Sequence, residues 1–256
     1  MKIAGLGWIP DLPDVRDVEH RFLPTLVRLP PSGSLDHALM PPKFNQLRAG
    51  SCTGASTSRA GMYLIARQGQ PRVPGGMSAL FPYFNGRDRE GNAGSDAGAQ
   101  IRDVVKGIVE FGLCAESLWP YDTKKVTTKP SERAYRDAHF TVLNKYQRIE
   151  PAGDARIELI RAAIANGNPV VFGFTVYESF ETAEVANTGI MPMPRRGERV
   201  IGGHAVWDWQ YDDNRRALRI RNSWGDWGID GDFWMPYEYA ANENLAADFW
   251  VLSNVT

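Results

Sequence analysis

Three polar residues that could act together on a carbonyl group occur in a fixed order along this chain of 256 residues. Cys52 follows a Gly-Ser pair and lies six positions after Gln46 (52 − 46 = 6). His204 follows two glycines, and Asn222 opens the segment Asn-Ser-Trp-Gly. A cysteine thiolate can attack a carbonyl carbon, an imidazole can carry the proton, and an amide oxygen can orient the imidazole. These residue types predict acyl transfer at a thiol.

Each of these residues has a role that its chemistry suggests. A free thiol is mostly protonated near neutral pH, so Cys52 needs a helix N-terminus or an imidazolium partner to become a nucleophile. His204 would exchange the proton, and Asn222 would hold the imidazole in place. Gln46 would donate a side-chain N–H to the developing oxyanion, which typically lowers the barrier by about 3–4 kcal/mol. Trp224 would screen the bond between His204 and Asn222 from water.

The elements that must position these groups can be read from local patterns. Residues 51–67 are mostly small and predict a central, buried helix with Cys52 in its first turn, although their Gly, Ser and Thr content lowers helix propensity. His204 begins an aromatic, partly alternating strand, and Asn222 follows the alternating strand 217–221. The other strong patterns are helices at 100–111, closed by Gly112, and at 155–166, and a strand at 169–176. A helical half followed by a strand-rich half predicts the α+β class.

Taken together, the motifs resemble those of the papain family of cysteine peptidases. The Gln…Cys block, Gly-Gly-His-Ala-Val at 202–206 and Asn-Ser-Trp-Gly at 222–225 match in order. Trp-Pro-Tyr at 119–121 and the segment 233–239, which we expect to be a strand, match as well. Family members carry the His and the Asn about 130–150 residues after the Cys, and the separations here are 152 (204 − 52) and 170 (222 − 52). The similarity extends from about residue 30 to the C-terminus, and it is to the bacterial branch without a long helical prosegment.

The resemblance implies a papain-like, two-lobed fold with the catalytic cleft between the lobes. A helical lobe would cover about 30–140, and a strand-rich, β-barrel-like lobe would cover about 141–256. Cys52 would be the nucleophile on one wall of the cleft. His204, as general acid and base, and Asn222, as its orienting partner, would lie on the other wall.

The resemblance also implies where substrate binds. It assigns Gly50 and Ser51 to the wall of the S1 subsite, and Gly98 and Ala99 to the backbone that pairs with substrate. The S2 pocket, which receives the P2 side chain, would be lined by Ile101, Gly173, Ala205 and Ala247. Trp224 would lie beside the catalytic histidine. With Ala247 on its floor the pocket would hold no acid. A hydrophobic P2 side chain would then be preferred over arginine.

Several positions depart from the family pattern. Thr53 replaces an aromatic residue, and Leu47 stands where glycine is common. In the family a disulfide ties the active-site loop to the segment whose backbone pairs with substrate. Both of its cysteines are missing here, where the positions are Ala49 and Asp96. We expect Asp96 to be a solvated residue without chemistry. None of these departures removes a predicted catalytic role.

Residues 1–29 form a Pro-rich, charged arm without helical or strand periodicity, far shorter than the family's helical prosegments. The segment 7–14 is apolar and stiffened by prolines, unlike a solvated tail. Two alternatives follow: the arm packs along the body and reaches the cleft, or it covers an apolar patch elsewhere. We expect Asp11, Asp14 and Asp17 to lie in turns and on solvated faces.

Composition narrows the partners. A net charge of −1 argues against nucleic acid, and the chain has no stretch of about 18 apolar residues that would predict a membrane span. No Cys/His cluster has zinc spacing, so we expect no metal and no cofactor. Only two cysteines occur, and a catalytic Cys52 leaves Cys114 unpaired. Without an apolar signal segment or disulfides we expect a cytoplasmic monomer acting on peptide or protein substrates, with export by another route or from a longer precursor left open.

Three functions fit these features. The first is a cysteine endopeptidase, and the second is a thiol acyltransferase or amidase with the same catalytic residues. The third is a catalytically silent binding protein that keeps the fold. A lone cysteine at a helix start is more often a buried small residue than a nucleophile, but its company of Gln, His and Asn favours an active enzyme. No inserted loop stands out that would block one end of the cleft, as an exopeptidase needs.

Overall fold

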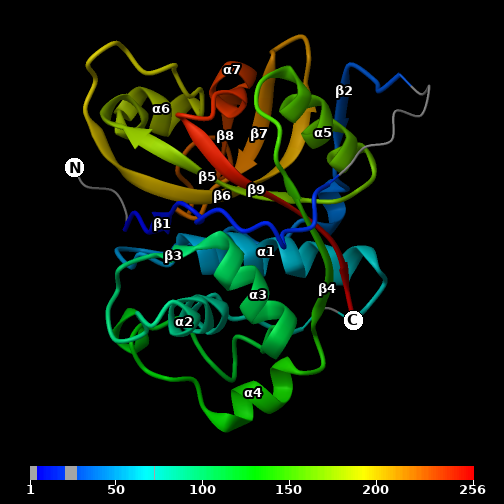
Figure 1. The fold of residues 1–256 in the computed structure, drawn as a ribbon, viewed down its shortest axis with the longest axis vertical. Helices are drawn as coiled ribbons and strands as arrows, with labels where there is room; N and C mark the ends of the chain where they lie inside the picture. Colours follow the sequence, from blue (N-terminus) through cyan, green and yellow to red (C-terminus); the bar gives the residue numbers. More distant parts are fainter. Residues whose placement is uncertain (1–4, 21–27, 72) are drawn as a thin grey trace.

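The computed structural model describes residues 5–20, 28–71 and 73–256. Two parts of the predicted arm, 1–4 and 21–27, therefore lie outside the described residues. The rest forms two lobes, with a long helix and the described part of the arm between them (Figure 1). The combination of helices and an antiparallel sheet confirms the predicted α+β class and the papain-like architecture.

The helices in the described part of the chain are distributed over both lobes (Figure 1). They are α1 (Cys52–Arg67), α2 (Leu80–Arg89), α3 (Ile101–Phe111), α4 (Glu132–Ala138), α5 (Asp154–Ala165), α6 (Ala183–Thr188) and α7 (Tyr237–Ala241), with short 3-10 turns at His37–Leu39, Thr123–Lys125 and Glu178–Glu181. In Figure 1, α2, α3 and α4 lie on one side of α1, and the sheet with α5, α6 and α7 lies on the other. Gly112 follows α3 with a φ of 86°, which closes the helix as its sequence predicts.

The sheet forms the second lobe. Its strands are β2 (Ser32–Ser34), β4 (Leu143–Ile149), β5 (Val170–Tyr177), β6 (Val200–Asp212), β7 (Ala217–Arg221), β8 (Asp232–Pro236) and β9 (Ala246–Val255). The order is β4-β9-β5-β6-β7-β8, with β2 paired antiparallel to β6. A separate parallel pair joins β1 (Trp8–Ile9) of the arm to β3 (Ala99–Gln100). The neighbouring strands β6 and β7 bring the predicted histidine and asparagine to one end of the sheet.

Helix α1 packs against both lobes, which explains how a sequence of low helix propensity forms a long helix. Most of its residues are buried, and Ser56 and Thr57 donate their hydroxyls to the Thr53 carbonyl at 3.1 and 2.7 Å. These two hydroxyls are thus satisfied inside the helix. A Cβ on Gly54 would lie 2.3 Å from the Ala79 carbonyl oxygen, so glycine is what lets α2 begin so close. Tertiary burial overrides the local propensity here.

Two sequence expectations differ from the structure. The predicted helical lobe begins at about 30, but β2 adds residues 32–34 to the sheet of the other lobe. Ser32–Ser34 belong to the sheet because they pair with residues 210–212 of β6. Three residues are too few to show a periodicity that would predict this pairing. The strand expected over 233–239 ends at Pro236, because the chain turns there into α7. Proline lacks the N–H that would continue a strand.

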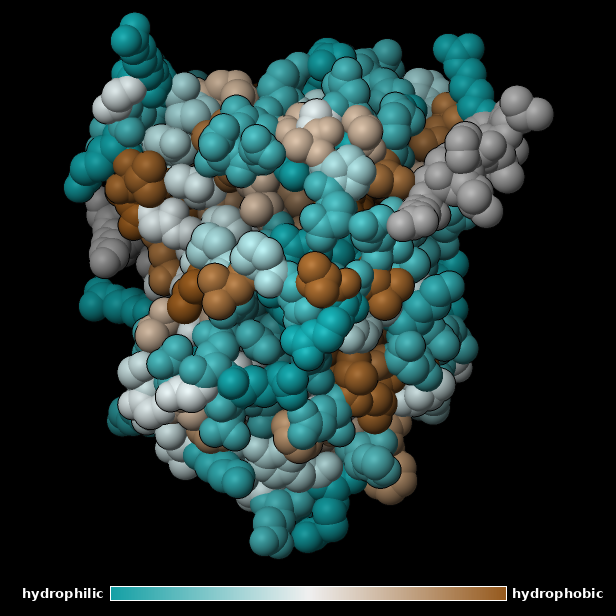
Figure 2. Space-filling model, in the orientation of Figure 1, coloured by the Kyte–Doolittle hydropathy of each residue, from teal (hydrophilic) through white to brown (hydrophobic). Residues whose placement is uncertain are grey.

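The surface carries apolar residues along the arm. Figure 2 shows hydrophobic residues in a row across the middle of this face, where the arm passes between the lobes in Figure 1. The exposed apolar side chains of the arm are Leu12, Val15 and Val18. None of the helices in the described part of the chain has the length and apolar character that a membrane crossing needs.

Candidate active site

The predicted histidine and asparagine are in direct contact. His204 Nε2 lies 2.8 Å from Asn222 Oδ1, which also accepts the Ser223 N–H at 2.8 Å. The asparagine oxygen therefore fixes the ring from one side. The Trp224 ring stacks on the imidazole with centroids 4.8 Å apart and an interplanar angle of 29°. The indole thus lies against the imidazole ring, whose bond to Asn222 the sequence predicts Trp224 to screen from water.

Cys52 stands in the first turn of α1, where its burial is complete. The backbone N–H groups of Ala205 and Gly7 face its sulfur. The Nδ1 atom of His204 has no hydrogen-bond partner in the described part of the chain. Strand β6, which carries His204, packs directly on α1, which begins at Cys52, so the two predicted reaction partners lie on facing elements.

Burial keeps this pair neutral. Desolvation raises the pKa of the Cys52 thiol to about 11, and the facing N–H groups offset it only in part. Desolvation also lowers the pKa of His204 to about 4, against the opposite effect of its bond to Asn222. At neutral pH the site as described therefore holds a thiol and a neutral imidazole. Such a thiol is a poor nucleophile.

Gln46, the predicted oxyanion donor, is already occupied. Its Nε2 donates to the carbonyl oxygens of Gly5 and Ala49, each at 2.8 Å. Its Oε1 accepts from the Ser223 hydroxyl, and its backbone N–H donates to the Ser223 carbonyl at 2.8 Å. The side chain is thus held rigidly, with one of its donors engaged by the arm. Tyr121 adds a further anchor, because its hydroxyl donates to the Gln46 carbonyl at 2.7 Å.

The arm lies in the cleft as an extended peptide. Gly7 accepts the Ala99 N–H at 2.8 Å, and β1 runs parallel to β3. A Cβ on Gly7 would lie 1.8 Å from the Gly50 carbonyl oxygen, and a Cβ on Gly98 would lie 2.3 Å from the Gly7 oxygen. The contact is therefore backbone against backbone at the residues predicted to bind substrate. Of the two alternatives for the arm, the structure has the one that reaches the cleft.

The Trp8 indole fills the predicted P2 pocket. A Cβ on Gly173 would lie 2.0 Å from the indole, so only glycine admits this ring. Ala247 pairs with Gly173 across β5 and β9, next to the indole. The indole N–H donates to the Asp248 carboxylate at 3.0 Å. The expectation that no acid lies there is wrong, because the residue after Ala247 turns its carboxylate to the end of the ring.

The arm runs against the direction of a substrate. A P2 residue precedes the scissile carbonyl, so a substrate must run from the Gly173 pocket toward Gln46. The arm instead has Gly5 at Gln46 and Trp8 in the pocket. The backbone of the arm is therefore reversed with respect to the direction predicted for a substrate. The arm thus fills the cleft in a non-productive way.

Buried ion pairs anchor the arm beyond the cleft. Arg102 binds Asp17 through three contacts of 2.5 to 3.0 Å, and Arg148 binds both Asp11 and Asp248 at 3.1 Å. Burial and the neighbouring Asp248 raise the pKa of Asp11 to about 7. The expectation of solvated faces for Asp11 and Asp17 is therefore wrong. Their arginine partners lie far away in sequence, and no local pattern signals them.

Asp96 also has a role that the sequence did not reveal. Its carboxylate accepts the Gly50 N–H at 3.0 and 3.1 Å and the Tyr83 hydroxyl at 2.6 Å. The Tyr83 oxygen in turn accepts the Gly98 N–H at 3.1 Å. We call this set of bonds the polar staple. It joins the loop before Cys52 to the backbone predicted to pair with substrate, at the place where the family disulfide is missing. The missing disulfide is the only feature of the sequence that could have indicated this role of Asp96.

The remaining predicted subsite residues are buried parts of the wall. Ser51 is closed to solvent, and its hydroxyl lies 2.6 Å from the Tyr121 hydroxyl, so only its backbone can face a substrate. Ile101 and Ala205 are fully buried. Over 5–20, 28–71 and 73–256, no group of three or more His, Cys, Asp and Glu side chains could hold a metal ion.

Comparisons with known proteins agree with this geometry. The family described as "Papain family cysteine protease" matches residues 38–249. An uncharacterized peptidase C1-like protein of Acanthamoeba polyphaga mimivirus is 42% identical over 219 residues, which cover 84% of this chain and 70% of the viral protein. The structure is similar to xylellain, a cysteine protease from Xylella fastidiosa, with 37% identity, a TM-score of 0.88 and coverage of 100% of this chain and 98% of xylellain.

A more distant structure shares the fold alone. A procathepsin B from Trypanosoma congolense has 17% identity and a TM-score of 0.74 over 100% of this chain and 87% of its own. The family match over most of the chain and the two closer relatives converge on one assignment. The chain belongs to the papain family and is a cysteine peptidase.

Proposed function

We propose that this peptidase is a latent endopeptidase, which cleaves extended polypeptides through Cys52 and is held inactive by its own arm. The single observation that carries the proposal is the arm itself. An extended peptide lies through the cleft, bonded to Gln46 at one end and to Ala99 further along. The sequence offers no inserted loop of the kind that blocks one end of the cleft in an exopeptidase, which favours cleavage within a chain over cleavage at its end.

In the proposed reaction the arm leaves and water enters the cleft. His204 then takes the Cys52 proton, and the thiolate attacks the substrate carbonyl carbon. Gln46 Nε2 and the Cys52 N–H receive the negative carbonyl oxygen. As the C–N bond breaks, the amine leaves with the imidazolium proton and a thioester remains on Cys52. Water then gives a proton to His204 and attacks the thioester, which releases the acid and restores the thiol.

The occupied pocket supports a preference for large aromatic P2 side chains. Gly173 leaves room for the Trp8 indole, which a larger residue there would fill. Asp248 adds an acceptor at the far end of the ring. We therefore propose tryptophan or another bulky aromatic residue at P2, which narrows the hydrophobic preference expected from the sequence.

Hydrolysis of a fluorogenic dipeptide with tryptophan at P2 tests the proposal in reducing buffer. The proteins are the whole chain, Cys52→Ala and Gly7→Leu, whose added side chain cannot coexist with the docked arm. Val15→Phe is the matched control, because Val15 is fully exposed on the same arm. We expect low turnover by the whole chain, much higher turnover by Gly7→Leu and no turnover by Cys52→Ala.

Two other results would redirect the assignment. Turnover that needs an added amine acceptor would indicate an acyltransferase. A Gly7→Leu protein whose thiol is alkylated but which cleaves no peptide would indicate a binding protein with the peptidase fold.

A further inference from the structure

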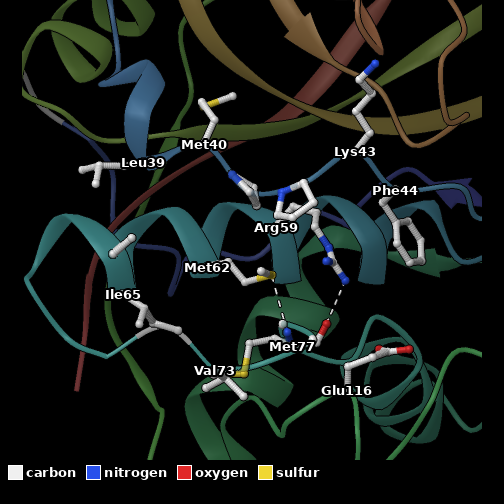
Figure 3. Close-up of a pocket in the computed structure, with 15 residues that line it drawn as sticks. Leu39, Met40, Lys43, Phe44, Arg59, Met62, Ile65, Val73, Met77 and Glu116 are labelled. Carbon is white, nitrogen blue, oxygen red and sulfur yellow. Dashed lines mark hydrogen bonds between the residues drawn. The ribbon is translucent and has the colours of Figure 1, made fainter.

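A cavity of about 370 Å³ lies beside the middle of α1, apart from the catalytic cleft. Its walls come from α1, from the segment 39–44 and from the segment 73–77 (Figure 3). The volume lies in the range of small-molecule sites. The arm does not enter it, since none of the lining residues belongs to the arm. The cavity therefore needs an explanation other than substrate binding.

The cavity is amphipathic along its length. Figure 3 shows Leu39, Ile65 and Val73 toward one end, with Arg59 and Glu116 toward the other. Apolar side chains thus line one end, and Arg59 and Glu116 lie at the other, beside the Phe44 ring. Lys43 also belongs to the lining, but its ammonium group is paired with Asp226 at 2.6 Å. A ligand that matches this division has an apolar body and a polar head.

Arg59 is a buried cation without a counter-ion in contact. Its side chain comes from α1, and only 7% of the residue is exposed. One nitrogen, Nη2, donates to the Met77 carbonyl at 2.8 Å, and the guanidinium lies 4.6 Å from the centre of the Phe44 ring. Its Nε has no partner, and no carboxylate of the described residues forms an ion pair with it. A buried charge is costly unless an opposite charge or hydrogen bonds satisfy it.

Glu116 compensates this charge only in part. Its Oε1 accepts the Tyr121 N–H at 2.5 Å, whereas its Oε2 is buried without a partner. Its charge acts on Arg59 from beyond contact distance. Burial raises the pKa of Glu116, against the opposite effects of the Tyr121 N–H and the Arg59 charge. Two polar atoms of residues in the cavity wall, Arg59 Nε and Glu116 Oε2, are thus left without a hydrogen-bond partner among the described residues.

We propose that this cavity binds a small carboxylic acid with an apolar chain or ring. The carboxylate accepts a charge-assisted hydrogen bond from Arg59 Nε, and the apolar part lies toward Leu39, Ile65 and Val73. A carboxylate carries the negative charge that Arg59 lacks in contact, which neither a neutral amide nor an amine supplies. The site is independent of the proposed endopeptidase activity, because no residue of it takes part in that reaction.

Calorimetric titration of the whole chain with three probes of equal chain length tests the proposal. The probes are octanoate, octanamide and octylamine, which differ only in the head group. Octanoate is expected to bind with a Kd on the order of 1 mM or tighter. The amide and the amine are expected to bind about tenfold to hundredfold more weakly, the usual worth of a hydrogen bond to a charged group. Equal binding of octanoate and octanamide, or no octanoate binding, would overturn the proposal.

Variants then locate the site. Ala66→Trp adds a ring to the half-buried wall of the cavity and should abolish octanoate binding. Arg59→Met should remove the preference for octanoate over octanamide, while Arg59→Lys should keep part of it. Octanoate binding that is unchanged in Ala66→Trp would place the ligand elsewhere and refute the assignment. If a variant fails to fold in a thermal scan, the three-probe comparison on the whole chain still decides.

Discussion

Displacing the arm should convert an inert thiol into a reactive one, and Gly7→Leu is a single substitution that should displace it. A Cβ at Gly7 would lie 1.8 Å from the Gly50 carbonyl oxygen and 2.5 Å from the Gly50 carbonyl carbon. No shift of a flexible side chain can relieve a clash between two backbones. The substitution leaves every residue of the peptidase body unchanged. Any change in reactivity must therefore come from the arm.

The size of the effect follows from the pKa of Cys52. With the arm docked this pKa is about 11, so at pH 7.5 about 3 in 10,000 thiols are ionised. A solvated thiol with a pKa of about 8.5 is about 9% ionised at that pH. The ratio is about 300, and pairing with an imidazolium would raise it to about 3,000, the limit for complete ionisation. The ionised fraction should rise by a factor between these values, and the alkylation rate should rise with it, because displacing the arm also opens access to the fully buried sulfur.

Alkylation by iodoacetamide, followed by mass spectrometry of the intact protein, measures this rate. Cys114 is a built-in control, because it is buried and its pKa is raised to about 12. Only one thiol should therefore react. Val15→Phe, on the exposed side of the arm, should behave as the unsubstituted chain. If Gly7→Leu and the unsubstituted chain are alkylated at the same rate, the arm does not suppress the thiol and the reasoning fails.

Three further changes test other parts of the structure. The raised pKa of Asp11, about 7 when docked, means that the docked arm holds a proton that a free arm releases near pH 4, so docking weakens as the pH rises from about 4 to 7. The measurement is the alkylation rate of the unsubstituted chain and of Asp11→Asn across this pH range, and the weakening of docking should be absent from Asp11→Asn. His204, whose pKa is lowered to about 4, contributes in the opposite direction in both proteins. Its contribution therefore cancels in the ratio of the two rates. Asp96→Asn, made in the Gly7→Leu background, should raise KM about tenfold with little change in kcat, because weaker charged hydrogen bonds loosen the substrate-pairing backbone; an unchanged KM would argue against the polar staple. Leu47 has a left-handed φ of 56°, so Leu47→Gly should raise the free energy of unfolding by up to about 1 kcal/mol in a denaturant titration, with glycine's greater freedom in the unfolded chain offsetting part of the gain.

The sequence was most informative where structure is local. Helix α1 begins at Cys52 and ends at Arg67, as its run of small residues predicts. Strand β7 has the predicted bounds, Ala217–Arg221, because its alternation matches one buried face. The contact between His204 and Asn222 follows once these strands pair. Short motifs on regular elements therefore placed most of the candidate site.

The contacts of the arm could not be predicted in this way. Asp11 and Asp17 are buried only because Arg102 and Arg148 meet them from positions 85 to 137 residues away. The pocket acid was missed for a related reason. Asp248 has a φ of 57°, which turns it out of the regular alternation of β9. Pairings over such distances, and a single residue of unusual backbone angle, leave no periodic signal.

The polar staple has a consequence for redox chemistry. A thiol peptidase works only while its nucleophile is kept reduced, yet the reductant that protects a thiol also attacks structural disulfides. Here the loop before Cys52 is held by Asp96 and Tyr83 through hydrogen bonds, and the chain's two cysteines are both free. The geometry of the cleft is therefore indifferent to the thiol–disulfide potential around it. Conditions reducing enough to protect the nucleophile leave its supporting loop intact.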